Sequence, residues 1–158
     1  MRPREPLRIE IPGRGALELR HLVLDLNGTI AVDGRVLAPV RRRLPALARV
    51  LEVRVLTADT FGTAARELSG LPVTLSPVRT GRDKAALVRS LGASGVAAVG
   101  NGANDAIVLR RAGLGVAVIG REGAAAAAVA AADVVVARVE DALDLLLRPG
   151  RLAATLRP

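Results

Sequence analysis

Residues around 7–20 alternate between apolar and polar positions, a pattern that the rest of the chain does not share. Residues 7–11 and 16–19 both show this alternation, and residues 12–15 between them read Pro-Gly-Arg-Gly. A period of two predicts half-buried strands, and a segment rich in Gly and Pro predicts a turn. We therefore expect residues 1–20 to form an N-terminal β-hairpin extension.

After residue 20, short continuous apolar runs alternate with segments of helical period. The runs predict strands buried on both faces at 22–24, 53–56, 73–75, 96–99, 116–119 and 134–136. The intervening segments predict helices at 39–50, 62–68, 83–91, 105–112, 122–131 and 140–147. Strands joined by helical crossovers predict an α/β fold, a Rossmann-like three-layer sandwich with a mainly parallel sheet, over residues 21–148.

Two further features complete the expected architecture. Residues 30–36 read Ile-Ala-Val-Asp-Gly-Arg-Val, and a central Asp-Gly is typical of a two-residue hairpin turn, so we expect a small flap hairpin here. The length of 158 residues suits one domain, so we expect residues 1–158 to form a single domain whose core is 21–148.

The composition excludes several functional classes. With 51% apolar and 24% charged residues the chain is not disordered. The absence of cysteine excludes disulfides, thiol catalysis and Cys-ligated metal, and the single histidine, His21, excludes a multi-histidine metal site. No uncharged run reaches the roughly 18 residues of a membrane-spanning helix. The start of the chain shows no signal peptide, so we expect a cytoplasmic protein with no membrane partner.

The charge balance is strongly basic. A net charge of +8 and a pI near 11.6 suit a polyanionic partner. However, the arginines are scattered apart from the run 41–43, and the one aromatic residue, Phe61, offers no platform for stacking bases. We therefore favour a solvated arginine surface over nucleic-acid binding, and core or lid packing for Phe61. The mean hydropathy of +0.36 favours a homo-oligomer.

A few rare residues point to the chemistry. Beside 22 arginines the chain has one lysine, Lys84, three asparagines and no glutamine. In a sequence biased this way, a position that stays Lys or Asn is one that chemistry requires. These residues and several carboxylates follow separate apolar strands or begin helices: Asp25, Asn27, Thr57, Asp59, Lys84, Asn101, Asn104 and Asp105. Because parallel strands present their carboxyl ends at one edge of a sheet, we expect these side chains to converge there.

Each segment supplies a different part of a phosphate site. Asp25 can attack phosphorus and bind Mg²⁺, and the backbone amides of Gly28 and Thr29 can cradle phosphate oxygens. Residues 57–59 (Thr-Ala-Asp) offer a hydroxyl and amides. The Lys84 ammonium acts as a compact point charge, which a planar guanidinium does not. Residues 100–105 (Gly-Asn-Gly-Ala-Asn-Asp) form a glycine-rich loop suited to Mg²⁺ and its waters.

Together these segments resemble the motifs of the haloacid dehalogenase-like (HAD) superfamily. The chain carries Asp-Leu-Asn-Gly-Thr from Asp25, Thr-Ala-Asp from Thr57, Asp83-Lys84, and Gly-Asn-Gly-Ala-Asn-Asp from Gly100, in the order of that family. Their form is similar to the phosphorylation domain of P-type ATPases and to small soluble P-type ATPase-like hydrolases. The gaps between the motifs leave no room for a cap domain, and the chain lacks pump helices.

The resemblance implies a role for each position. Asp25 would be a nucleophile that becomes an aspartyl phosphate, and Mg²⁺ would bind Asp25, the Asn27 carbonyl, Asn101 and Asp105. A phosphorylated small molecule or nucleotide would be the substrate.

The resemblance also assigns the phosphate contacts. Thr57 would hydrogen-bond the phosphoryl group, and Lys84 would neutralise its charge. The remaining expected phosphate contacts are Gly28, Thr29, Ala58 and Asn104.

Two departures from the family pattern leave a second reading open. Asn27 stands where an Asp usually acts as general acid/base, a role worth roughly 10²–10⁴-fold. Asn101 replaces a carboxylate that usually binds the metal. The chain is therefore either a slow phosphohydrolase or a catalytically weak phosphate- or nucleotide-binding regulatory protein. Both asparagines precede glycine, so we also hypothesise that deamidation restores the two carboxylates.

Overall fold

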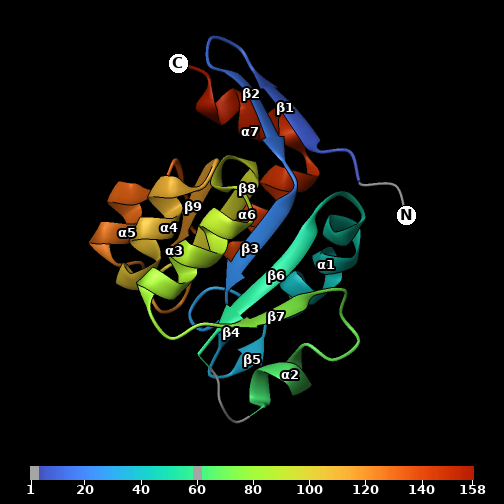
Figure 1. Ribbon diagram of the computed structural model, residues 1–158, viewed down its shortest axis with the longest axis vertical. Coiled ribbons are helices and arrows are strands. Elements are labelled where there is room, and N and C mark those ends of the chain that lie inside the picture. Colours follow the sequence, from blue (N-terminus) through green and yellow to red (C-terminus); the bar gives the residue numbers. More distant parts are fainter. Residues whose placement is uncertain (1–3, 59–61) are drawn as a thin grey trace.

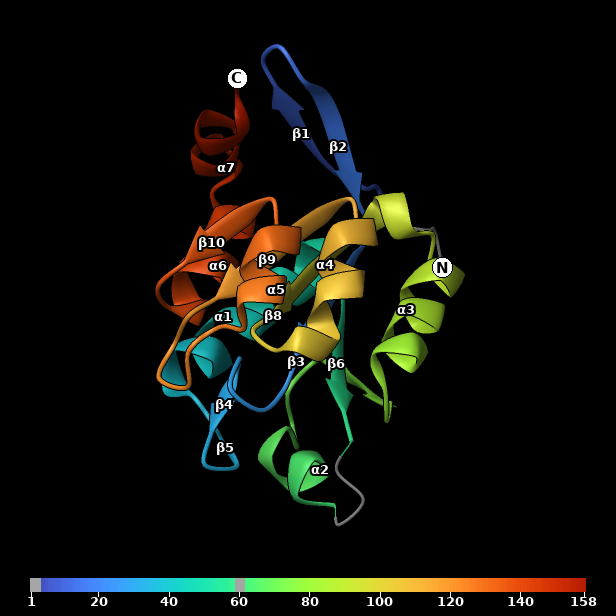
Figure 2. The same ribbon diagram turned by 90° about the vertical axis from the view of Figure 1, so that its left-hand side faces the viewer.

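A parallel sheet forms the centre of the protein, whose computed structural model describes residues 4–58 and 62–158. The strand order is β10-β9-β8-β3-β6-β7, and every neighbouring pair is parallel (Figures 1 and 2). The strands are β3 (His21–Asp25), β6 (Glu52–Thr57), β7 (Thr74–Pro77), β8 (Val96–Gly100), β9 (Leu114–Val118) and β10 (Val134–Val136). Each contains or overlaps one apolar run of the sequence, so the predicted α/β fold is confirmed.

Helices cover both faces of this sheet and make three layers (Figure 2). Helices α1 (Ala38–Val50) and α6 (Val139–Leu147) pack together on one face. On the other face lie α3 (Gly81–Ser90), α4 (Ala106–Arg111) and α5 (Ala126–Ala131). The central strand β3 buries Leu22 and Leu24 in the first layer and Val23 in the second, which explains why its apolar run is continuous.

The predicted N-terminal hairpin is present but stands apart from the main sheet. Strands β1 (Leu7–Ile11) and β2 (Gly15–Leu19) pair antiparallel in a sheet of their own. A helix that the pattern did not predict, α7 (Pro149–Leu156), packs against β1. The hydrophobic pattern is interrupted at Pro149-Gly150, although Pro is well tolerated in the first turn of a helix.

The flap hairpin is also confirmed, at the other end of the molecule (Figure 1). Strands β4 (Ala31–Val32) and β5 (Arg35–Val36) are joined through Asp33 and Gly34, which have φ of 51° and 77°. Positive φ at both positions is the requirement of a type I′ turn. The short helix α2 (Thr63–Glu67) lies beside the flap.

One helix begins later than predicted. Helix α5 begins at Ala126, whereas the alanine-rich sequence favoured a start at residue 122. The preceding segment is held to the loop after β8 instead: Ala125 N–H donates to the Asn101 carbonyl at 2.8 Å, and the Asn101 side chain donates to the Gly123 carbonyl at 3.0 Å. A 3₁₀ turn, η2 (Ala103–Asp105), likewise precedes α4.

Across residues 4–58 and 62–158, no helix combines the length and apolar character that a membrane crossing requires.

Candidate active site

The candidate site lies where the three central strands end. Asp25 is the last residue of β3, Thr57 the last of β6 and Gly100 the last of β8, and these strands are neighbours in the sheet. The parallel arrangement therefore delivers three of the predicted motifs to one edge, as expected from the strand pattern.

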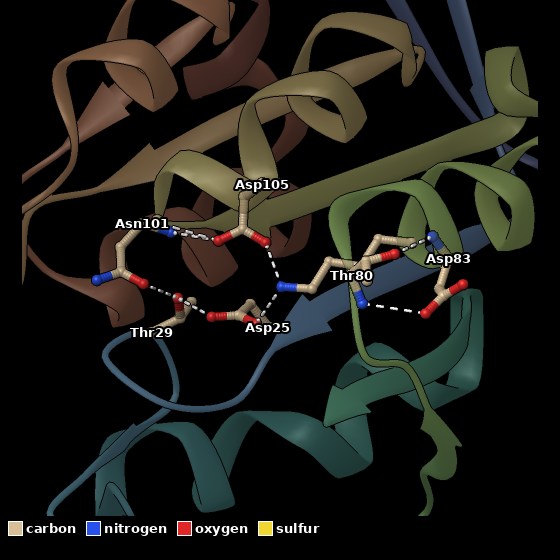
Figure 3. Close-up of polar contacts among 8 residues, drawn as sticks. Asp25, Thr29, Thr80, Asp83, Asn101 and Asp105 are labelled. Carbon is tan, nitrogen blue, oxygen red and sulfur yellow. Dashed lines mark hydrogen bonds and ion pairs between the residues drawn. The ribbon is translucent and has the colours of Figure 1, made fainter. Parts of the chain in front are cut away.

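A buried lysine joins two of these motifs. Lys84 Nζ donates to Asp25 Oδ1 at 2.8 Å and to Asp105 Oδ1 at 2.7 Å (Figure 3). Lys84 is only 5% exposed and Asp105 only 4%. The predicted convergence of Asp25, the single lysine and the asparagine-rich loop is therefore present. With both carboxylates ionised, the three groups carry one net negative charge.

Helix α3 holds Lys84 in place through its first turn. Thr80 accepts a hydrogen bond from Asp83 N at 3.2 Å, and Asp83 Oδ2 accepts from Thr80 N and Arg79 N, both at 3.0 Å. This capping box fixes where the helix begins, so the residue after Asp83 faces the site. The backbone N–H groups of Arg79 and Thr80 hold the pKa of Asp83 below its usual value.

Asp105 has a different role from the expected one. Its Oδ2 accepts hydrogen bonds from the backbone N–H groups of Asn101 at 3.1 Å and Gly102 at 2.9 Å, while Oδ1 binds Lys84. Both oxygens are thus engaged in folding the loop and holding the ammonium. The expected direct bond from Asp105 to a metal is therefore not supported by this arrangement.

The amides of Gly28 and Thr29 also differ from expectation. Gly28 N–H donates to the Ala31 carbonyl at 2.8 Å, and Thr29 N–H donates to Leu26 at 3.3 Å. Both amides stabilise the turn into the flap, so they are not available to cradle phosphate. Gly28 has a φ of +78°, and a Cβ there would lie 2.6 Å from Asn101 Nδ2, so the turn and the loop both require glycine at this position.

The remaining predicted residues surround one cavity of about 210 Å³. Its lining includes Asp25, Asn27, Thr57, Ala58, Lys84, Asn101 and Asn104. Thr57 is buried, whereas the side chains of Asn27 and Asn104 are exposed at the cavity mouth. Two predicted features, Asp59 and Phe61, lie outside the described residues. His21 lies at the opposite end of β3, with its ring 3.5 Å from Glu52, and takes no part in the site.

Comparison with solved structures shows what this arrangement is similar to. A HAD superfamily (subfamily III A) hydrolase of Legionella pneumophila superposes with a TM-score of 0.70 and 19% identity, covering 87% of both chains. A 3-deoxy-D-manno-octulosonate 8-phosphate phosphatase of Moraxella catarrhalis, in complex with magnesium, phosphate and KDO, gives a TM-score of 0.70 and 16% identity, covering 88% of this chain and 94% of that one. The chain has the HAD fold.

A zinc-transporting PIB-type ATPase is a more distant neighbour. It gives a TM-score of 0.63 and 23% identity, and the match covers 75% of this chain but 20% of the ATPase. The resemblance of the motifs to P-type ATPases is thus matched by a resemblance in fold.

Sequence comparison finds relatives without a described function. MJ0073, an uncharacterized protein of Methanocaldococcus jannaschii, is 50% identical over 62 residues, which are 39% of this chain and 67% of that protein. MJ0072 of the same organism is 49% identical over 39 residues, 25% of this chain and 89% of that protein. The chain belongs to the same family as MJ0073. No protein-family model matches it.

The electrostatics of this HAD-fold site follow from burial. Burial raises the pKa of Asp25, and the neighbouring Asp105 carboxylate raises it further, against the opposing effect of Lys84. Burial alone would lower the pKa of Lys84, but the two carboxylates outweigh it and the pKa is raised. Lys84 is therefore firmly charged, while Asp25 is a more basic carboxylate than an exposed one.

Three oxygens, one each from Asp25, Thr29 and Asn101, form a candidate cation position. Thr29 Oγ1 lies 3.3 Å from Asp25 Oδ2 and 3.1 Å from Asn101 Oδ1, yet the hydroxyl has a single proton to share between them. The hydrogen bond from Asn101 Nδ2 to Gly123 fixes the amide so that its oxygen faces Thr29. An excess of oxygens over protons fits a hard cation such as Mg²⁺.

The donor set is weaker than a carboxylate cluster. In the described part of the chain, no three acidic, histidine or cysteine side chains gather where they could hold a metal ion. A metal at this site would therefore depend on Asp25 together with neutral amide, hydroxyl and carbonyl oxygens.

The geometry works against the deamidation hypothesis. Deamidation requires the amide nitrogen after an asparagine to attack the side chain. Gly28 N–H is engaged with Ala31, and Gly102 N–H with Asp105. These hydrogen bonds restrain both attacking nitrogens, so we expect slow deamidation while the protein is folded.

Proposed function

We propose that the protein is a Mg²⁺-dependent phosphohydrolase that acts through a phosphorylated Asp25. The observation that carries the proposal is the buried Lys84 ammonium clamped between Asp25 and Asp105 beside a polar cavity. Buried ion groups of this kind contribute little net stability, because desolvation offsets their attraction. Their position in a cavity at the carboxyl edge of the sheet instead favours chemistry.

In the first step Asp25 attacks the phosphoryl group of the substrate. A carboxylate oxygen forms a bond to phosphorus while the bond to the leaving-group oxygen breaks, and the electron pair leaves with that oxygen. Lys84 neutralises the charge shared by Asp25 and the phosphoryl group, and Thr57, Ala58 and Asn104 contact the phosphoryl oxygens.

In the second step water attacks the phosphorus of the aspartyl phosphate, releasing inorganic phosphate and regenerating Asp25. Asn27 lines the cavity where an acid/base would stand, but its amide transfers no proton. Protons must therefore come from and go to solvent, which slows both steps. Substrates whose leaving groups need no protonation, such as acyl phosphates, are favoured.

Mg²⁺ would be held by Asp25, Asn101, the Thr29 hydroxyl and the Asn27 carbonyl, and when bound it would neutralise charge on the phosphoryl oxygens. Asp105 holds Lys84 and the loop rather than the metal. The cavity takes a phosphorylated small molecule or a nucleotide.

The test is a hydrolysis assay with para-nitrophenyl phosphate, acetyl phosphate and ATP, with and without Mg²⁺. The proposal predicts Mg²⁺-dependent phosphate release that Asp25→Asn abolishes while the fold, followed by circular dichroism, stays intact. Release that survives Asp25→Asn would contradict the assignment of the nucleophile.

The amides at positions 27 and 101 favour a second candidate, a phosphate- or nucleotide-binding regulatory protein with weak catalysis. This candidate predicts that wild type and Asp25→Asn show the same negligible turnover, and that calorimetry still detects binding of phosphate compounds. The two candidates therefore differ in the first assay.

A further inference from the structure

Arginines line one side of the candidate site and continue beyond it. Arg79 lines the cavity that contains Asp25 and Lys84. Arg82 and Arg110 line a second, shallower hollow, and Asn104 borders both. The phosphate cavity thus opens along a rim of three arginines, Arg79, Arg82 and Arg110, which we call the arginine rim.

Tight packing brings the rim together from two helices. Arg82 is in the first turn of α3, and Arg110 is in the last turn of α4. A Cβ on Gly81 would lie 2.8 Å from the Asn104 carbonyl oxygen, so only glycine allows α3 to approach η2 this closely. The seam between these elements is therefore a fixed feature of the fold.

The positive charge of the arginine rim is available to bind a ligand. All three arginines are exposed, and in the portions of the chain that the structure covers none of them has a carboxylate within ion-pair distance. The adjacent acid, Asp83, is engaged by two backbone N–H groups. Arg79 and Arg82 also stand at the positive end of α3, where a cation is unfavourable until an anion joins it.

The opposite side of the site lacks the exposed arginines of the rim. A hollow of about 330 Å³ between the flap and α2 shares Asn27 and Ala58 with the phosphate cavity, and Glu67 is the charged residue among those that line it. The Val36 N–H group, and then Arg41, hold the pKa of Glu67 below its usual value, so it stays ionised. Arg41 pairs with Glu67 at 2.7 Å, and no arginine or lysine is among the described residues that line this hollow. A second anion is therefore favoured at the arginine rim rather than here.

We propose that the ligand carries a second anionic group, a carboxylate or another phosphate, which binds the arginine rim while its phosphoryl group occupies the Lys84 cavity. This inference rests on the proposed function for the location of the phosphoryl group. It narrows the substrate class to small phosphorylated compounds with two anionic groups.

Binding calorimetry on Asp25→Asn protein, in which turnover is blocked, tests the proposal. One pair of probes is glucose 6-phosphate and 6-phosphogluconate, which adds a carboxylate. The other pair is fructose 6-phosphate and fructose 1,6-bisphosphate, which adds a phosphate. In at least one pair we expect the compound with the second anion to bind about tenfold more tightly, and the pair that shows this identifies the anion.

Alanine at position 79, 82 or 110 should reduce this preference by about threefold each, and NaCl from about 0.05 to about 0.5 M should reduce it as well. The matched control is Arg89→Ala, which removes the same charge from the far end of α3 and should leave the preference unchanged. Because the preference is a ratio, a variant that folds poorly loses both affinities and does not mimic the expected result.

No preference in either pair, or an equal reduction in Arg89→Ala, would overturn the inference. Failure of the proposed function looks different: phosphate release would be absent from the hydrolysis assay while the preference remained. If phosphate is released but neither pair shows a preference for the second anion, the arginine rim has no role in ligand binding, and the phosphohydrolase proposal is unaffected.

Discussion

At the scale of single residues, Lys84 holds together two carboxylates that would otherwise repel each other. Its ammonium reaches Asp25 and Asp105 at 2.8 and 2.7 Å from inside the fold. A guanidinium in the same place is larger, planar and directional, so it cannot occupy the same point between them. The lysine therefore remains in a chain that otherwise uses arginine.

We expect Lys84→Arg to fold but to lose phosphate release by about 10²-fold or more, because the charge moves away from the phosphoryl oxygens. Initial rates with acetyl phosphate, together with circular dichroism, measure this. The control is Arg89→Lys, the reverse exchange on the same helix, which should keep its activity. A Lys84→Arg rate within about threefold of wild type would contradict the role given to the ammonium.

Substitution of Asn27 gives the opposite prediction, an increase in the rate of hydrolysis. Asn27→Asp supplies the missing acid/base at the cavity mouth and should raise hydrolysis of para-nitrophenyl phosphate by about 10²-fold. The gain should be much smaller for acetyl phosphate, whose leaving group needs no proton. Asn27→Ser serves as the control for the loss of the amide. Equal gains on both substrates would show that the carboxylate does not act as an acid.

The residues that meet in the candidate site could be predicted from the sequence because they are rare or polar types at strand ends or, for Lys84, in the first turn of a helix. It could not show how Asp105 divides its two oxygens between Lys84 and the loop amides, or that Thr29 shares one proton between two oxygens. These facts depend on side-chain positions within a few tenths of an ångström. The capping role of Asp83 was visible in principle, since Thr80 precedes it by three residues.

At the scale of elements, an ion pair joins the two helices on one face of the sheet. Arg43 of α1 donates to both oxygens of Asp144 of α6, at 2.8 and 3.1 Å. These bonds lower the pKa of Asp144 below its usual 3.8. A lowered pKa means that the folded state favours the ionised carboxylate. The pair therefore stabilises the protein at pH values above the ordinary pKa of an aspartate, and this stabilisation is lost as the pH falls through the lowered pKa of the folded state.

We expect Asp144→Asn to lower the free energy of unfolding by about 1 kcal/mol at neutral pH, because the pair is partly exposed and solvent weakens it. The loss should persist to about pH 4 and narrow below it, as the wild-type carboxylate is protonated. Urea denaturation at several pH values measures it. The control is Asp33→Asn, which removes the same charge from the exposed flap turn, where asparagine also tolerates the positive φ. A loss that stays constant below about pH 4 would show that charge is not its cause.

The elements were predictable where hydrophobicity has a clear period. Strands β3, β8, β9 and β10 carry continuous apolar runs, because helices cover both faces of the sheet, whereas β6 is interrupted by Arg54 and the edge strand β7 has Leu75 as its one aliphatic residue. Helix α7 was missed because Pro149 and Gly150 interrupt the pattern. The late start of α5 depends on its tie to the loop at Asn101, a contact between distant parts of the chain that propensity does not contain.

At the scale of the whole molecule, the proposed Mg²⁺ site would link stability to cation binding. The oxygens of Asp25, Thr29 and Asn101 lie together in the folded protein, so a cation bound there would favour the folded state. Magnesium at about 100 times its dissociation constant should add about 2.7 kcal/mol, which raises the melting temperature by roughly 5–10 °C for a chain of this size. Thermal melts with Mg²⁺ or with EDTA measure the shift.

Asp25→Asn should remove most of that shift, whereas Asp141→Asn should leave it intact. A rise of equal size in Asp25→Asn would place the cation elsewhere. The expected homo-oligomer stays a prediction at this scale, and sedimentation measures it.

The contacts of Lys84 span 59 residues back to Asp25 and 21 residues forward to Asp105. Ribosomes make Asp25 before either of these partners, so the three groups cannot meet in a nascent chain that has not yet reached Asp105. Under the proposed function, a phosphorylated Asp25 would therefore require a chain translated at least through Asp105.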